Sequence, residues 1–188
     1  MIIKKTIMRN LIIILTVFCM HLLKCNETVL GIMEAIQKKQ VIVKPVGLGA
    51  HSGDCVNLEI ENKTRRSMEI IIEPGMRLIA ADEKYQDILL VKETRIRLNG
   101  REKRTVRLKG YCCQLNDLSP PEKMLFTFSE NADSGLVALA KFLNMNEFSD
   151  SMEQDAVWAL SDNRPTASVA YIVDSINTRL LELVSVLK

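Results

Sequence analysis

Between residues 41 and 128 the hydrophobic positions recur in short runs that are typical of β-strands. In residues 55–62 apolar and polar side chains alternate, so that Val56, Leu58 and Ile60 share one face. Turn-forming residues separate the other runs, which are 41–46, 67–73, 76–81, 87–92, 94–98, 105–112 and 125–128. Asn99-Gly100 is a strong hairpin signal. Short strands in close succession predict an antiparallel β-sandwich.

Outside this region the hydrophobic spacing is helical. Residues 26–40 predict a short helix before the strands. Three more helices are predicted after them: one capped by Ser134, one capped by Ser151, and one over residues 166–187. The apolar stripe of the last helix has two interpretations, packing onto the sandwich, which we favour, or a dimer or coiled-coil face. The predicted class is therefore α+β, an antiparallel β-sandwich (β-rich 41–128) followed by C-terminal helices (134–187).

The first residues predict export. Lys4, Lys5 and Arg9 precede a short apolar run, residues 11–23. A membrane span needs about 20 apolar residues, so residues 1–25 are interpreted as a signal peptide and residues 26–188 as a single secreted domain. Cys25 follows the run in a pattern that resembles a lipoprotein box, with Lys24 where a small residue is usual. Two alternatives stay open: lipidation at Cys25, which anchors the chain to a membrane, or simple cleavage into the periplasm, the cell surface or the medium.

Charge excludes one class of partner. The chain has 25 basic and 23 acidic residues, but four of the basic ones lie in residues 1–25, which leaves 21 against 23. No basic patch remains to indicate nucleic-acid binding.

Three cysteines follow the predicted leader, an odd number for an oxidising compartment. Alternation along the strand directs Cys112 into the core and Cys113 outward, and Cys55 has the parity opposite to Val56, so it also points outward. One disulfide fits this arrangement, Cys55–Cys113. It leaves Cys112 inside and unpaired.

Two short motifs carry a resemblance. Tyr111-Cys112 ends a strand, and Gln154-Asp155-Ala156-Val157-Trp158 follows on a helix, where Gln154 and Trp158 share a face. An aromatic-Cys pair followed by Gln-x-Ala-aliphatic-Trp resembles the thioester domain of bacterial surface adhesins. The resemblance implies an internal thioester between Cys112 and Gln154, with Tyr111, Ala156 and Trp158 as packing residues. The family usually has Thr before the Gln, and this chain has Glu153.

The resemblance predicts an adhesion domain that captures an amine on a protein or another surface ligand, once per molecule and without a cofactor or metal, so not an enzyme. The alternative is a non-covalent binding module stapled by the disulfide, with Gln154 closing a capping box with Ser151. A Cys–His enzyme that uses His51 and Cys112 is a third, less favoured hypothesis. A zinc site of His51 and the three cysteines is also disfavoured, because adjacent strand residues point apart.

Overall fold

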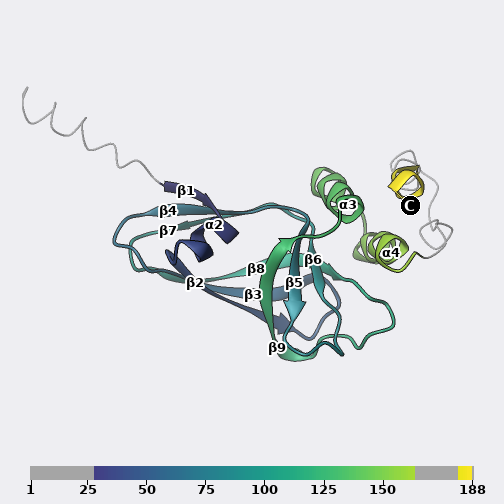
Figure 1. Cartoon of the computed structure of the whole chain (residues 1–188), viewed down its shortest axis with the longest axis horizontal. Coiled ribbons are helices and arrows are strands. Elements are labelled where there is room, and N and C mark those ends of the chain that lie inside the picture. Colours follow the sequence, from purple (N-terminus) through teal and green to yellow (C-terminus); the bar gives the residue numbers. More distant parts are fainter. Residues whose placement is uncertain (1–27, 164–181, 188) are drawn as a thin grey trace, which may run out of the picture.

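The computed structural model describes residues 28–163 and 182–187. Six antiparallel strands form a closed barrel in the order β2-β3-β8-β6-β5-β9. They are β2 (Val41–Leu48), β3 (Ser52–Asn62), β5 (Met76–Ala80), β6 (Ile88–Leu90), β8 (Lys103–Cys112) and β9 (Glu122–Asn131). Figure 1 shows the barrel in the middle of the molecule, with helices α3 (Ser134–Met145) and α4 (Asp150–Ser161) beside it.

The predicted β-sandwich is wrong, because the sheet closes on itself. β2 pairs with β3 along one edge and with β9 along the other, so this strand is not an edge strand. Bulges interrupt the register between Val46 and Leu48, between Asp54 and Val56, and between Met76 and Leu78. A bulge bends a strand and increases its twist, which favours closure. The fold is mostly β, with a few short helices.

A second sheet of three strands adjoins the barrel. It has the order β1-β4-β7 and is formed by β1 (Thr28–Gly31), β4 (Met68–Ile72) and β7 (Thr94–Leu98). The helix predicted for residues 26–40 is reduced to α2 (Ile32–Gln37), because β1 pairs in parallel with β4 first. Residues 26 and 27 lie outside the described residues.

The turn at Asn99-Gly100 exists, but it does not join a hairpin. β7 pairs with β4, whereas β8 pairs with β3 and β6. The turn is tied to another loop instead: the side-chain amide of buried Asn62 donates hydrogen bonds to Asn99 O and Arg66 O, both at 2.8 Å. A Cβ on Gly100 would lie 2.3 Å from Arg65 O, so this close approach requires glycine.

Both described C-terminal helices begin slightly earlier than predicted. Asp133 caps α3, since its carboxylate accepts a hydrogen bond from Leu136 N at 3.0 Å. Ser149 rather than Ser151 caps α4. Of the third predicted helix, residues 182–187 are helical and residues 166–181 lie outside the described residues. No helix within the described residues is both long and apolar enough to cross a membrane.

The buried side chains form two cores. The first fills the barrel and continues beneath the three-stranded sheet and α2. The second lies between the outer face of the barrel wall and the helices: Leu89, Val91, Tyr111 and Cys113 pack there with residues of α3, α4 and the 182–187 segment. The barrel wall at β6 and β8 is therefore buried on both of its faces.

Candidate functional site

The end of β8 places two neighbouring side chains on opposite faces of the barrel wall. Tyr111 and Cys112 are both fully buried. Cys112 belongs to the core inside the barrel and Tyr111 to the core beneath the helices. The inward orientation of Cys112 agrees with the alternation of side chains along a strand. The predicted thiol is thus buried where the strand ends.

Helix α4 lies against the outer face of β8 and carries the other predicted residues. Ser149 Oγ accepts a hydrogen bond from Met152 N and begins the helix. Ala156 is fully buried against the barrel wall. Gly53 on β3 allows this close approach, because a Cβ there would lie 2.6 Å from Asp150 Oδ2 and the glycine has a φ of +72°.

The side-chain amide of Gln154 is hydrogen-bonded to the backbone of Cys112. Cys112 N donates to Gln154 Oε1 at 3.1 Å, and Gln154 Nε2 donates to Cys112 O at 2.8 Å. Gln154 is 3% exposed and Cys112 is 0% exposed. The structure therefore brings together two residues that lie 42 positions apart. Gln154 does not close the capping box with Ser151 that the sequence offered as an alternative, because its amide is engaged by the backbone of β8.

His51 and Trp158 flank this contact from two different elements. His51 O accepts a second hydrogen bond from Cys112 N, at 3.0 Å. The imidazole of His51 is stacked on the indole of Trp158, with ring centroids 6.4 Å apart and an angle of 10° between the planes. Trp158 Nε1 is buried and has no hydrogen-bond partner among the described residues. Within those residues the His51 ring makes no interaction with a cysteine thiol, so the structure gives a Cys–His dyad no support.

A polar cluster beside Gln154 was missed from the sequence. Lys109 Nζ lies 2.9 Å from Asp150 Oδ1 and 3.3 Å from Oε2 of fully buried Glu153, and Tyr111 OH donates to Asp150 Oδ1 at 2.8 Å. These residues join β8 to the first turns of α4. Strand parity alone places Lys109 on the outer face of the barrel, but it does not show that a helix with two acidic residues covers that face.

The ion pairs shift the pKa values of the cluster. Hydrogen bonds from Lys109 and then from Tyr111 hold the pKa of Asp150 below its usual value. Burial lowers the pKa of Lys109, but the carboxylates of Asp150 and Glu153 outweigh it and the pKa is raised. Burial, followed by the neighbouring carboxylates, raises the pKa of Tyr111. The phenol therefore acts as a neutral hydrogen-bond donor.

The three cysteines of the described region are free thiols, and all are buried. Cys55 was predicted to point outward, but it is buried in the barrel core. The bulge between Asp54 and Val56 changes the alternation of side chains there. Cys113 does face outward, but helices cover it. Burial raises the pKa of Cys55 and of Cys113 to about 12 and also raises the pKa of Cys112.

The structure also corrects the predicted disulfide between Cys55 and Cys113. Asp54 pairs with Lys109 in the β3–β8 register, four positions before Cys113. At about 3.3 Å per residue the two cysteines are offset by well over 7 Å, the limit for a bridge. Among the described residues, no group of three or more His, Cys, Asp or Glu side chains is arranged to hold a metal ion, so the zinc alternative lacks its ligand set there.

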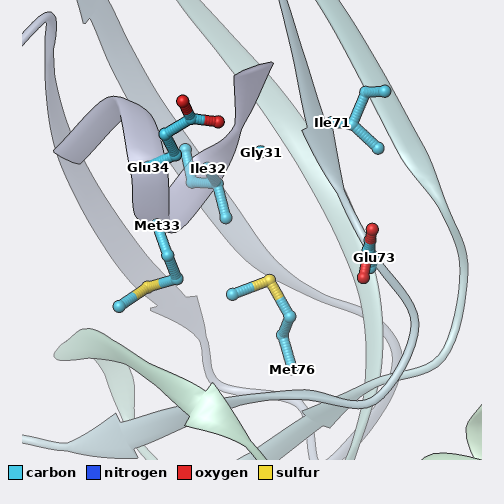
Figure 2. Close-up of a pocket in the computed structure, with 7 residues that line it drawn as sticks. All are labelled: Gly31, Ile32, Met33, Glu34, Ile71, Glu73 and Met76. Atoms are coloured by element: carbon cyan, nitrogen blue, oxygen red, sulfur yellow. The ribbon is translucent and has the colours of Figure 1, made fainter. Parts of the chain in front are cut away.

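A cavity of about 420 Å³ opens elsewhere, where the three-stranded sheet meets the barrel. Figure 2 shows Met76 extending toward Met33, with Glu34 on α2 and Glu73 on the opposite side of the view. No local sequence pattern predicts this cavity, because its lining comes from β1, α2, the end of β4 and the start of β5. It contains neither Cys112 nor Gln154.

Comparison of the chain with protein-family models, with curated proteins and with solved structures finds no match. The candidate site is therefore defined by its own geometry. Cys25 and the predicted leader lie outside the described residues.

Proposed function

We propose that this chain is an exported binding domain in which Cys112 and Gln154 condense into an internal thioester that captures an amine on a partner surface. The observation that supports the proposal is that the Gln154 side-chain amide is hydrogen-bonded to the backbone N and O of Cys112, with both residues buried. The Cys112 thiol belongs to the core inside the barrel, so condensation also requires the thiol to turn toward the Gln154 amide. Export is inferred from residues 1–25, with Cys25 as a lipid anchor or with simple cleavage as the alternative route.

The surroundings suit a bond that must be kept from water. Tyr111 and Ala156 are fully buried beside the pair, and Trp158 lies one helical turn beyond Gln154. Exclusion of water protects a reactive acyl bond until a partner arrives. Burial also raises the pKa of Cys112, so its thiol stays protonated and poorly reactive toward oxidants when it is free.

The proposed chemistry has two balanced steps. In the first, the sulfur of Cys112 bonds to the side-chain carbonyl carbon of Gln154, the C–N bond breaks, and the nitrogen leaves as ammonia with the thiol proton. In the second, a partner amine bonds to the same carbon, the C–S bond breaks, and the sulfur recovers a proton from the amine. Each molecule reacts once, so this is covalent binding rather than catalysis.

A second function, non-covalent binding, is favoured by the same two hydrogen bonds. They satisfy both ends of the Gln154 amide and the backbone of Cys112, which is a complete structural role. In this alternative Gln154 has a structural role and fastens α4 to the barrel.

Intact mass separates the two functions. Protein produced from the whole chain is compared with Cys112→Ala before and after exposure to methylamine. We expect wild type to lack one ammonia, to gain one methylamine on treatment, and the variant to do neither. Cys55→Ala is the matched control, since it removes another buried thiol that does not contact Gln154. The same spectrum defines the first residue and any lipid on Cys25.

A wild-type protein of full mass that methylamine leaves unchanged would contradict the thioester. Non-covalent binding would then remain, and Gln154 would be a structural residue.

A further inference from the structure

The cavity between α2 and the start of β5 carries an inference that does not depend on the thioester. We propose that it binds the side chain of a lysine on a partner protein. The lining of the cavity is largely apolar, and of its two carboxylates, Glu73 has no ion pair within the described residues.

The apolar side chains that line the cavity differ in how far they are exposed. Ile32 and Met76 are buried at 1% and 5% exposure, whereas Met33 is partly exposed. Figure 2 shows the end of the Met76 side chain pointing toward Met33, whose own end turns away. Unbranched methionine side chains adapt to ligands of varied shape. This lining suits a flexible methylene stem.

Two carboxylates stand at the sides of the cavity. Glu34 is half exposed and pairs with Lys38 at 2.6 Å, one helical turn away. Glu73 is exposed and has no ion pair within the part of the chain that the structure describes. A ligand that enters must therefore be positively charged at one end and apolar along its length, which describes a lysine side chain.

Other ligand classes fit this lining less well. Ca²⁺ and Mg²⁺ take about six or more oxygen ligands, whereas the lining residues provide two carboxylates. Recognition of a quaternary ammonium uses a cage of aromatic rings, and no aromatic residue lines the cavity. The volume of about 420 Å³ lies in the range of ordinary ligand pockets, so a lysine with its flanking peptide can be accommodated.

Gly31 provides a way to block the cavity without disturbing the fold. It lines the cavity at the N-cap of α2, with φ −65° and ψ 149°, a conformation open to any residue. A Cβ added there has nothing within 4 Å. A valine at this position would extend into open space rather than into the core.

Methionine methyl NMR on protein produced from the whole chain reports directly on ligand binding in the cavity. The probe is a capped Gly-Lys-Gly tripeptide, and the matched probe has norleucine, which keeps the stem and lacks the charge. We expect the lysine peptide to shift the Met33 and Met76 signals and to leave Met145 and Met152 unchanged, while the norleucine peptide shifts none.

Variants then test whether binding depends on the two carboxylates and on an open cavity. Glu73→Gln and Glu34→Gln should each weaken binding by roughly two- to five-fold, as for exposed ion pairs. Gly31→Val should abolish it, and Glu83→Gln, which removes an exposed carboxylate outside the cavity, should leave it unchanged.

Equal shifts with both peptides, shifts at all methionines, or no shift would each overturn the proposal. Shifts of Met33 and Met76 that depend on protein concentration alone would also overturn it, because the occupant would then be a second copy of this chain. A wild-type mass without a thioester would leave this test unaffected.

Discussion

The core inside the barrel and the core beneath α3 and α4 are built in different ways. Inside the barrel, side chains that alternate along each strand meet in an apolar interior. Beneath the helices, the apolar contacts are joined by Gln154, Glu153 and Lys109, which link α4 to β8 through hydrogen bonds and ion pairs. The candidate site lies where these two regions share one residue pair, Cys112 and Gln154.

The difference shows that apolar burial and directional polar contacts have different roles in this fold. The interior gains stability by removing apolar surface from water, a term that does not depend on direction. The interface between α4 and β8 uses directional contacts, which fix the position of the helix against the strand. We therefore expect interior changes to affect global stability most, and changes at the interface to act first on α4.

The largest expected effect is in the interior. Leu58→Ala removes a fully buried side chain of β3, so we expect a loss of about 2–5 kcal/mol in the free energy of unfolding. Ile42→Ala on the neighbouring strand is the control, because Ile42 is 54% exposed and its truncation should cost less than about 0.5 kcal/mol. Urea unfolding measures both values. A similar loss in the two variants would contradict the assignment of the interior as the main source of stability.

Local elements could be predicted from the sequence because their signals are local. The strand over residues 94–98 has the predicted bounds, and the predicted run 105–112 lies within Lys103–Cys112. The four apolar residues Ile88 to Val91 had no alternation to assign a face, and the structure explains this by burying them all.

Pairing between distant elements could not be predicted in the same way. The bulge at Asp54 and Val56 reverses the parity on which the disulfide was based. The turn at Asn99-Gly100 has its expected residues, but the strands before and after it pair with other strands, and the turn itself contacts Asn62 and Arg65. The same short alternating strands can form a sandwich or a closed barrel. Which of the two forms depends on which strands pair and in which register, and local sequence patterns do not show this.

Part of the candidate site could nevertheless be predicted from the sequence. The spacing of Gln154 and Trp158 and the strand-end position of Cys112 selected residues that lie together in the structure. What the motif did not reveal is that the Gln154 amide binds the backbone of Cys112 and that Lys109 supports the same helix. Those contacts depend on the tertiary position of α4.

The second prediction separates the two regions. Gln154→Leu keeps the approximate size of the side chain and removes both hydrogen bonds to Cys112, leaving its carbonyl without that partner. We expect a loss of about 1–3 kcal/mol, with faster hydrogen exchange in α4 and unchanged protection inside the barrel. Asp155→Ala, the next residue on the helix, is the control. Equal loss of protection in the barrel strands would show that the interface and the interior unfold as one unit.

The smallest effect concerns the ion pair between Asp150 and Lys109. Because the pKa of Asp150 is lowered on folding, first by Lys109 and then by Tyr111, the folded state favours the charged carboxylate. This stabilisation is complete above the unfolded pKa of about 3.9 and is lost as pH falls through the lower folded pKa. The Asp150 side chain is 56% exposed, so solvent screening limits the contribution to at most about 1 kcal/mol.

The measurement is the difference in unfolding free energy between wild type and Asp150→Asn, followed from about pH 6 to about pH 2. We expect the advantage of wild type to be constant at the higher pH and to shrink below about pH 4, as protonation removes the charge that Lys109 contacts. Lys109→Met should reduce this pH dependence to the smaller part that Tyr111 contributes. A difference that stays constant to the lowest pH would mean that α4 is held by Gln154 and apolar packing alone, and the contrast between the two cores would then rest on a single side chain.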